Sequence, residues 1–518
     1  MKLPEHLTSL LKSKLNNYWL SVIAILIVAA ALRLTGLNFS YSNDELSALL
    51  RVRYSSFSEL VSKGFYVDGH PGGIQVFLYY WVKLFGMSET AVRLPFALGG
   101  VLATFMAIRL FTRWFNPAAG LLTGAFIAFL QFPLLYSQIA RPYGSGLLFS
   151  LIMTWYWTKL LFDEKPLKRD ALAYALAAAA CMYNHYFSFL LALIIGITGL
   201  FYLKKDRIIH YLLAGLLAAA LFSPHIYITL NHLSIGGVGQ WLDKPETAWL
   251  FKHIFYVFND SIIMLLIVAV SMAVLFLFSG QFIKPTKFHL FALLFFILPF
   301  LVGFFYSRYV NPVLQHSVLI FSFPFFLALL FSFTEKISAR RLNQLVLVVL
   351  ISGTSQTIAG NNYYTSQHFG EFRGIAQTIA GWNQQFGQDK ITRAISVNNP
   401  WYIDYYLLQT PQGKTTFEQY DNRGGTYLDS LSTILNQCRT EYFMYAWTKP
   451  VPLEIKDMIQ ARFPCILSDT NFGGLSEATL YQRKHDLCHG PKADTLFRVT
   501  KQQNKDLPDN YLILDSLE

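Results

Sequence analysis

Long apolar stretches alternate with short polar connections along the first two thirds of this chain, and they predict a bundle of membrane-spanning helices. A helix needs about 20 predominantly apolar residues to cross the hydrocarbon core of a bilayer. Apolar stretches that approach this length lie at 18–37, 91–111, 119–136, 144–162, 171–185, 187–203, 211–229, 261–279, 288–306, 317–333 and 343–359. We therefore expect an α-helical polytopic membrane protein with about eleven transmembrane helices.

The distribution of lysine and arginine among the connections predicts the orientation of these spans. Short connections rich in Lys and Arg tend to stay in the cytoplasm. Basic residues cluster at the N-terminus and after every second span: Lys2, Lys12 and Lys14; Arg109 and Arg113; Lys165, Lys168 and Arg169; Lys204, Lys205 and Arg207; Lys284 and Lys287; and Lys336, Arg340 and Arg341. This alternation predicts an odd number of spans, a cytoplasmic N-terminus and an extracytoplasmic C-terminal part.

One further apolar segment, at 74–86, is short for a span. It has 13 residues ("IQVFLYYWVKLFG") and contains Lys83. Its Trp, Tyr and Lys residues suit a helix that lies in the headgroup region. If it crossed the bilayer, every later basic connection would face outward. We therefore expect residues 38–90 to form one large outer loop with interfacial helices.

The composition changes from apolar to polar at about residue 361. Strand-like segments ("ITRAISVN", "TEYFMYAW" and "ATLYQRK") alternate there with helix-like segments ("PWYIDYYLLQ", "LDSLSTILNQ" and "VPLEIKDMIQARF"). Such alternation is typical of a small α/β domain. The sequence thus predicts a transmembrane domain at 1–360 and an extracytoplasmic α/β domain at 361–518. In an oxidising compartment one pair among Cys438, Cys465 and Cys488 could form a disulfide, and the sequence leaves the pairing open.

The composition agrees with a membrane protein. Of the 518 residues, 53% are hydrophobic, 16% are aromatic and 14% are charged, with a mean hydropathy of +0.36. Soluble domains contain about 25% charged residues. The formal charge of +11 comes largely from the short connections. Because no basic stripe marks a soluble domain, we expect membrane lipid and no nucleic acid as a partner.

Candidate chemistry lies in the predicted outer loop. The acidic pair Asp44 and Glu45 follows the first span, and Asp68 and His70 occur in "GFYVDGHPGG". A charged side chain at the bilayer centre costs about 2.5–3.5 kcal/mol or more, so these groups are either held in water or retained for chemistry. The structural alternatives are a helix cap or a water-boundary marker for the acidic pair and a simple turn for Gly-His-Pro-Gly.

The order of several motifs resembles a known superfamily. After one N-terminal span come "SNDE", "DGHPGG", "SETAVRLPFALGG" and "SQIARPY". This order resembles the GT-C superfamily of glycosyltransferases, which use polyprenyl-phosphate sugars. It is most similar to the branch of the protein O-mannosyltransferases and the lipid A aminoarabinose transferase. The resemblance covers about residues 1–340 and implies the GT-C fold.

The resemblance also implies roles for particular residues. Asp44 matches the acidic residue that is the presumed catalytic base of the family, with Glu45 beside it as a second catalytic candidate. "HPGG" matches a His-Pro-Pro segment, with Gly72 in place of the second proline. The candidate substrate-binding residues are Asp68, His70, Arg141, Tyr143, His185 and Arg308. The resemblance implies His70, Arg141 and Tyr143. Arg308 substitutes as the phosphate contact, because Gln315 and His316 stand where relatives often have an Arg-Tyr pair.

Each of the membrane-boundary candidates has a structural alternative. Arg141 could extend toward lipid headgroups, and His185 could bind backbone or line a cavity. Asp, Glu and His side chains suit several divalent metals. No spacing of the HExxH kind assigns a metal, so a divalent cation stays an open alternative to a site without a cofactor.

The function implied is transfer of a monosaccharide from a polyprenyl phosphate with inversion at the anomeric carbon. The reaction needs a base for the acceptor hydroxyl, in-line geometry and cations at the departing phosphate. The acceptor could be lipid A, a surface glycan or a protein, at the outer face of a bacterial inner membrane. The alternatives are a transporter or flippase of lipid-linked sugars, and an assembly subunit. Transporters commonly contain repeats and helices broken near the midplane.

Overall fold

The computed structural model describes residues 5–234, 242–335, 337–421, 428–448, 451, 453–483, 497–499 and 514–516. The chain forms two compact units. The first comprises Met1–Asn38 and Arg51–Tyr363, and the second comprises Phe39–Leu50 and Tyr364–Glu518.

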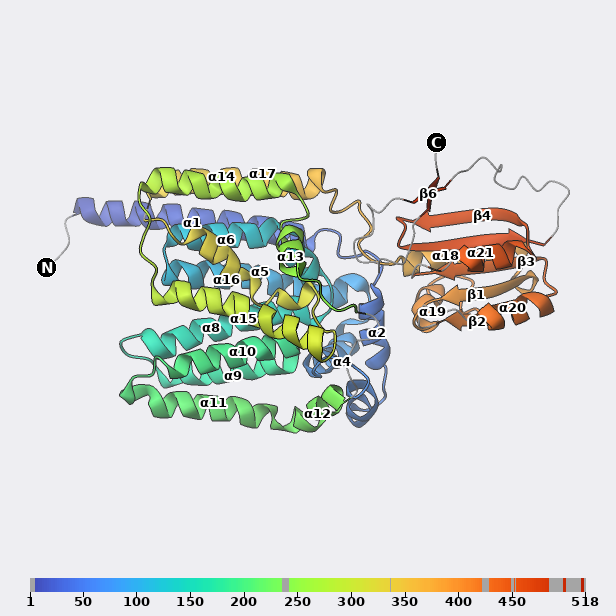
Figure 1. Cartoon of the computed structure of the whole chain (residues 1–518), viewed down its shortest axis with the longest axis horizontal. Helices are drawn as coiled ribbons and strands as arrows, with labels where there is room; N and C mark the ends of the chain where they lie inside the picture. The colour runs from blue at the N-terminus through green and yellow to red at the C-terminus, as the bar shows by residue number, and fades with distance from the viewer. Residues whose placement is uncertain are drawn as a thin grey trace. The chain divides into compact units, whose positions relative to one another are not determined.

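The first unit is a bundle of long helices (Figure 1). Its helices are α1 (Glu5–Leu34), α5 (Glu89–Trp114), α6 (Pro117–Phe129), α7 (Gln131–Gln138), α8 (Pro142–Phe162), α9 (Lys168–Asn184), α10 (Tyr186–Leu200), α11 (Ile208–Phe222), α14 (Ile262–Ser279), α15 (Lys287–Tyr309), α16 (Phe323–Phe331) and α17 (Ala339–Ser355). Shorter helices, α4 (Gly73–Phe85), α12 (Ile226–Ser234) and α13 (Trp249–Val257), lie at one end of the bundle.

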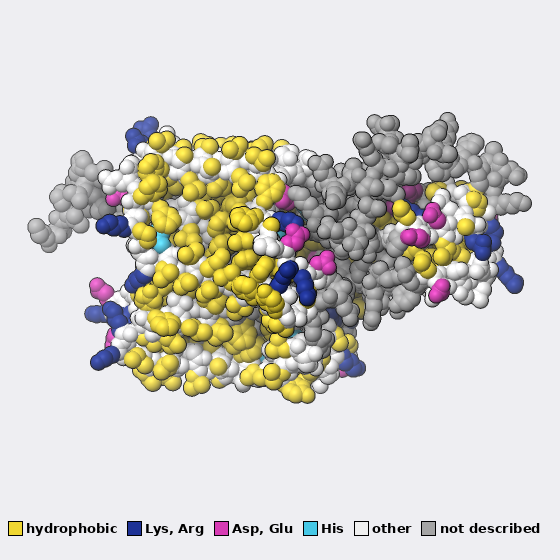
Figure 2. Space-filling view, in the orientation of Figure 1, with side chains coloured by type: hydrophobic (Ala, Val, Ile, Leu, Met, Phe, Trp, Pro, Cys, Tyr) yellow, Lys and Arg dark blue, Asp and Glu magenta, His cyan; other side chains and the backbone are white. Residues whose placement is uncertain are grey.

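The surface of the bundle is suited to lipid. Apolar side chains cover most of the visible face, and Lys and Arg lie at both ends of the bundle, with a row of them at the end opposite α4, α12 and α13 (Figure 2). Several of the basic connections recognised in the sequence, for example the one between α10 and α11, lie at that end. The structure thus places these basic connections together.

Each of the eleven predicted spans contains a helix, but several helices are shorter than predicted. In the part of the chain that the structure describes, five helices are long and apolar enough to cross a membrane: Glu89–Trp114, Lys205–Ser234, Ile262–Ser279, Lys287–Tyr309 and Ala339–Gly360. The helix α10 has 15 residues and α16 has 9, whereas the predicted spans 187–203 and 317–333 have 17 each. The short segment at 74–86 forms α4, which has 13 residues and an exposed as well as a buried side.

The helices α6 and α7 form one broken element, which would make a sixth span if counted as one. They are bent by 58° because Leu130 between them has an extended backbone. The carbonyl groups at the end of α6 accept hydrogen bonds from the buried Arg33, which reaches Ala128 O (2.9 Å) and Ile127 O (2.8 Å). The Thr357 hydroxyl donates to Phe129 O (2.8 Å). The break is therefore stabilised by side chains from elsewhere in the bundle.

The second unit contains a five-stranded sheet in the order β2-β1-β3-β5-β4. Its strands are β1 (Ile391–Ser396), β2 (Gln419–Asp421), β3 (Tyr442–Trp447), β4 (Cys465–Phe472) and β5 (Ser476–Gln482). The first three are parallel, whereas β5 pairs antiparallel with β3 and β4. The helices are α18 (Phe372–Phe386), α19 (Trp401–Leu407), α20 (Leu428–Gln437) and α21 (Leu453–Gln460). A separate pair is formed by β6 (Phe497–Val499) and β7 (Leu514–Ser516).

The sequence identified most elements of this unit. The three strand-like segments form β1, β3 and β5, and the three helix-like segments form α19, α20 and α21. Leu431 and Leu435 of α20 and Ile455 and Ile459 of α21 pack on Phe443 and its neighbours in one core. Cys465 takes part in a disulfide and Cys438 has a free thiol, while Cys488 lies outside the described residues.

The segment 39–50, with the start of α2 (Asn43–Arg51), belongs to this second unit. The Tyr41 N–H donates to the Tyr406 hydroxyl (2.8 Å), and the Asn398 side-chain amide donates to Asn43 Oδ1 (2.7 Å). The acidic pair is therefore anchored to the polar C-terminal part of the chain, although it follows the first helix of the bundle.

The buried Arg33 should be essential for the stability of the helix break. We expect Arg33→Met to lower the free energy of unfolding by about 2–4 kcal/mol, because buried carbonyl groups would lose their donors. Thermal unfolding in detergent would measure the change. The exposed Arg340→Met is the control and should change little. Equal unfolding temperatures for both variants would contradict this account of the break.

Candidate functional site

A buried carboxylate, Asp68, organises the polar end of the first unit. Asp68 follows η1 (Leu60–Phe65) and precedes α4, and its side chain is only 4% exposed. Its Oδ2 atom accepts hydrogen bonds from Arg51 NH1 (2.8 Å) and Gln75 Nε2 (2.8 Å), and its Oδ1 atom lies 3.0 Å from His70 Nδ1. Both oxygens thus have donors.

The charge state of Asp68 follows from these contacts. Burial alone would raise its pKa, but the hydrogen bond from His70 and the charges of Arg51, His70 and Arg141 outweigh burial and hold the pKa well below its usual value. Asp68 is therefore ionised. Because its oxygens are already bound, it is better suited to hold cations in place than to accept a proton from substrate.

His70 connects Asp68 to the next residues of the cluster. Its Nδ1 atom lies 3.0 Å from Asp68 Oδ1 and 3.1 Å from Arg141 NH2. One ring nitrogen cannot donate to the carboxylate and accept from the guanidinium at the same time, so these contacts are alternatives. The His70 ring is 4.9 Å from the His185 ring, centroid to centroid, and its side chain is 25% exposed. The ring is therefore partly accessible from outside.

Arg141 and His185 both occupy N-cap positions of long helices. Arg141 immediately precedes α8, which starts with Pro142, and His185 immediately precedes α10. His185 Nδ1 accepts a hydrogen bond from Phe187 N–H (3.0 Å), so Nε2 carries the hydrogen of the neutral ring. Tyr143, in the first turn of α8, lies with its ring 6.0 Å from that of His185. Two positive helix ends and one guanidinium thus border His70.

Two further histidines hold the loop that carries Asp68 and His70. His225 Nε2 accepts from Gly72 N–H (2.9 Å), and His232 Nε2 donates to Phe65 O (2.7 Å). Their Nδ1 atoms contact the hydroxyls of Thr229 (3.0 Å) and Tyr186 (2.7 Å). The His225 ring is neutral in this arrangement, because its Nε2 atom accepts a hydrogen bond.

His225 and His232 are not among the residues for which the sequence predicts a role. Their spacing of seven residues, two helical turns, puts them on one face of a helix, and that signal was available in the sequence. The two histidines hydrogen-bond to Phe65 and Gly72, which lie on either side of Asp68 and His70. The elements η3 (Ser223–His225) and α12 therefore hold this loop in place, and we call them its brace.

The glycines of "HPGG" are explained by close packing. A Cβ atom at Gly73 would lie 2.5 Å from the backbone oxygen of Tyr183, and one at Gly72 would lie 2.6 Å from the Phe65 ring. Backbone cannot move aside as a flexible side chain can. The glycine at position 73 therefore lets the start of α4 pack against the end of α9.

The structure brings together five of the predicted site residues: Asp68, His70, Arg141, Tyr143 and His185. Arg308 is exposed at the end of α15, and its guanidinium donates to Pro245 O (3.2 Å). Among the described contacts, none joins Arg308 to this cluster. The cluster residues lie in different connections between helices. The sequence pattern could therefore only partly predict that they lie close together in space.

Asp44 and Glu45 lie in the second unit, in the first turn of α2. Glu45 is fully buried, and its carboxylate accepts from the Ser42 N–H (3.0 Å) and the Ser42 hydroxyl (3.0 Å), while Glu45 N–H contacts Ser42 Oγ (3.3 Å). These reciprocal bonds form a capping box. Asp44 beside it is exposed. Glu45 thus fixes the helix start that presents Asp44.

Among the residues that the structure describes, no three His, Cys, Asp or Glu side chains are grouped so that they could hold a metal ion. In the Asp68 cluster the carboxylate oxygens and His70 Nδ1 are already engaged with protein groups. The described site can therefore supply positive charge through arginine and helix ends.

Comparisons with known proteins bear on the fold and on one stretch of the sequence. Residues 69–228 match the family described as dolichyl-phosphate-mannose-protein mannosyltransferase, a range that contains His70, Arg141, His185 and His225. ArnT from Cupriavidus metallidurans in the apo state superposes with a TM-score of 0.54 at 13% identity, over 89% of this chain and 97% of that chain. The same protein bound to undecaprenyl phosphate gives 0.55 at 12% identity, with the same coverage. The chain has the GT-C fold.

The predicted resemblance is thereby confirmed. A GT-C fold with several apolar helices makes this a multi-pass membrane protein. No curated protein sequence matches the chain. At these identities the structural likeness concerns the fold, so the activity rests on the residues of this chain.

The Asp68 cluster should be a major source of stability in its loop. We expect Asp68→Asn to cost about 3–5 kcal/mol in the free energy of unfolding, because Arg51 would lose a largely buried partner. The matched control is Glu59→Gln in the exposed pair with Lys63, which should change little. Thermal unfolding in detergent at pH 7 would compare the two, and equal effects would contradict the organising role of Asp68.

The same cluster predicts a pH dependence. Because folding lowers the pKa of Asp68, its contribution is present above the unfolded pKa of about 3.9 and is lost only as the pH falls through the folded value. In a His70→Gln background, which leaves no imidazole in contact with the carboxylate, the stability cost of Asp68→Asn should therefore stay constant from about pH 5 to pH 8. A difference that disappears within that window would show that Asp68 is not held ionised.

Proposed function

We propose that this protein is an inverting glycosyltransferase that moves a monosaccharide from a polyprenyl-phosphate donor to a hydroxyl acceptor at the outer face of a bacterial inner membrane. The observation that carries the proposal is the Asp68–His70–Arg141–His185 cluster, which lies at the polar end of a GT-C fold. The acceptor is lipid A, a surface glycan or a protein. The binding of undecaprenyl phosphate by ArnT supports the choice of donor.

The cluster is suited to a sugar phosphate. Arg141 presents a planar guanidinium that can bind two phosphate oxygens, and the N-termini of α8 and α10 favour an anion. Asp68 and Arg51 hold His70 beside Arg141. We assign Arg141 to the donor phosphate, with His70, Tyr143 and His185 at the sugar and phosphate edges. Arg308, bound to Pro245 O, remains a second proposed phosphate contact.

Asp44 is the proposed base. It accepts the proton of the acceptor hydroxyl as the acceptor oxygen forms a bond to the anomeric carbon. The bond between that carbon and the phosphate oxygen breaks, and the polyprenyl phosphate leaves with the electron pair. Attack opposite to the leaving group inverts the anomeric carbon. The capping box of Ser42 and Glu45 fixes the helix that presents Asp44.

The alternative is a transporter or flippase of lipid-linked sugars. The broken pair α6–α7 favours it, since broken helices are common in transporters. In transporters the exposed backbone at such breaks binds the substrate, whereas here Arg33 and Thr357 bind carbonyls at the end of α6. The break therefore has a structural explanation, and the transferase is the better-supported function.

Asp44→Asn should remove transfer but not donor binding. We expect the rate of sugar transfer to fall about 10²–10⁴-fold, the usual contribution of a general base. The assay would follow labelled sugar from a polyprenyl-phosphate donor into lipid, glycan and protein fractions of the cell envelope. The matched variant is Glu45→Gln, which keeps the acceptors of the capping box and should retain most activity. Normal turnover by Asp44→Asn would exclude this base.

Arg141→Lys should weaken the interaction with the phosphate while keeping the charge. A lost hydrogen bond to a charged group costs about 1.5–3 kcal/mol, so we expect a 10- to 100-fold fall in kcat/KM. Arg340→Lys, an exposed substitution in α17, should leave kcat/KM unchanged. If Arg141→Lys behaved like Arg340→Lys, the phosphate would have to bind elsewhere.

A further inference from the structure

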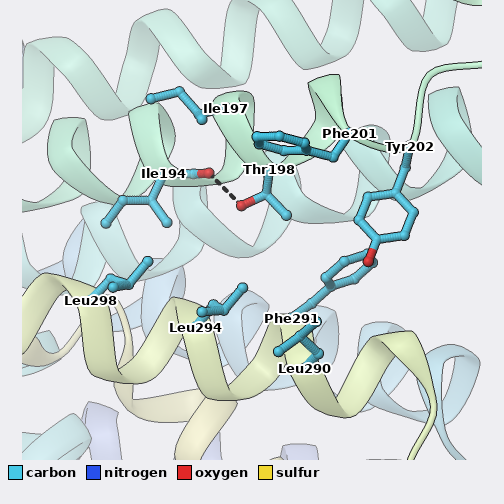
Figure 3. Close-up of a pocket in the computed structure, with 9 residues that line it drawn as sticks. All are labelled: Ile194, Ile197, Thr198, Phe201, Tyr202, Leu290, Phe291, Leu294 and Leu298. Atoms are coloured by element: carbon cyan, nitrogen blue, oxygen red, sulfur yellow. Dashed lines mark hydrogen bonds between the residues drawn. The ribbon is translucent and has the colours of Figure 1, made fainter.

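An apolar groove lies between α10 and α15 (Figure 3). It has a volume of about 460 Å³ and is lined by Ile194, Ile197, Thr198, Phe201, Tyr202, Leu290, Phe291, Leu294 and Leu298. The Thr198 hydroxyl donates to Ile194 O (2.7 Å), as the dashed line in Figure 3 shows, so it offers the groove little polarity. Such a lining suits a hydrocarbon chain.

The two walls of the groove are regular helical stripes. On α15 the lining residues recur at intervals of three and four, from Leu290 to Leu298, and on α10 from Ile194 to Phe201. With a rise of about 1.5 Å per residue, each wall is about 10–12 Å long. The side chain of Phe201 is 82% exposed, and Leu290 and Ile197 are about half exposed. The groove is therefore open to the surrounding lipid.

Two lysines extend these stripes at one end of the groove. Lys287 begins α15, one turn before Leu290 and Phe291, and Lys204 follows Tyr202 by two residues. The Tyr202 ring lies 6.2 Å from the Phe162 ring, centroid to centroid, which brings the chain at Lys204 to the ring that Lys287 also contacts. Lys287 Nζ lies 3.8 Å from the centre of the Phe162 ring. The groove thus ends at a pair of like charges.

Three of the neighbouring cations have acidic partners, whereas Lys205 and Lys284 have none among the described contacts. Arg113 pairs with Asp163, Lys159 with Asp170 and Arg207 with Asp206. Within the described part of the chain, no carboxylate lies within salt-bridge distance of Lys204 or Lys287. Two adjacent positive charges without acidic partners at the end of an apolar groove are complementary to a lipid phosphate.

We propose that this groove binds an anionic glycerophospholipid, with one acyl chain between α10 and α15 and the phosphate between Lys204 and Lys287. Moving an acyl chain from the bilayer into the groove gains little, because lipid tails are already apolar surroundings. The selectivity must therefore come from the lysines. The site uses none of the residues assigned to sugar transfer, so it stands independently of the proposed function.

Native mass spectrometry of the whole protein in detergent would test the site. The probes are phosphatidylglycerol and phosphatidylcholine with identical acyl chains. We expect the wild type to bind phosphatidylglycerol more tightly by about 30-fold, the factor that about 1 kcal/mol per lysine implies. The double variant Lys204→Gln/Lys287→Gln should lose this preference. These lysines are exposed, so the variant should fold normally.

The control is Lys205→Gln/Lys284→Gln, which removes the same charge from exposed positions outside the two stripes and should keep the preference. A groove-filling variant, Leu294→Trp, should weaken the binding of both lipids equally. Equal binding of the two lipids by the wild type, or equal losses in both double variants, would overturn the proposal. Undecaprenyl phosphate could also displace bound phosphatidylglycerol at a concentration below the Kd of phosphatidylglycerol. That result would identify the carrier lipid as the occupant and would also overturn the proposal.

Discussion

A single buried carboxylate, Asp68, holds the polar end of the first unit together. Burial of an ion is costly unless donors surround it, and here Arg51, Gln75 and His70 supply them. This requirement fixes the path of the loop between η1 and α4, and with it the position of His70 beside Arg141 and His185. The site residues therefore lie in loops between helices. The hydrogen bonds and ion pairs of Asp68, rather than a helix or a strand, hold these loops in place.

The brace of His225 and His232 shows how the helical bundle supports that network. Both rings use both nitrogens for hydrogen bonds. They bind the backbone on either side of Asp68 and His70, and so the geometry of the loop depends on the helix that continues from α11. The chemistry is thus concentrated at the end of the bundle with the short helices, whereas the lysines of the lipid groove lie at the opposite end of α10 and α15.

Much of the fold could be predicted from the sequence, because each helix that crosses a lipid bilayer requires a long apolar stretch of consecutive residues. Each predicted span contains a helix, and the short segment at 74–86 became α4. Span lengths were less predictable, since the bend at Leu130 and the short α16 depend on tertiary contacts such as those of Arg33. The anchoring of residues 39–50 to the second unit likewise rests on long-range bonds, for example between Asn43 and Asn398. Of the site, Asp68, His70, Arg141 and His185 were recognised from motifs, whereas the partners Arg51 and Gln75 carry no motif of their own.

The proposed transfer depends on one contact, in which Arg141, held beside His70 by the Asp68 network, receives the phosphate of a polyprenyl donor. A structure of the protein determined with undecaprenyl phosphate bound would test it most directly. We expect phosphate oxygens within hydrogen-bonding distance of the Arg141 guanidinium, next to the His70 and His185 rings. A phosphate bound away from these residues, with the Asp68 network unchanged, would contradict it.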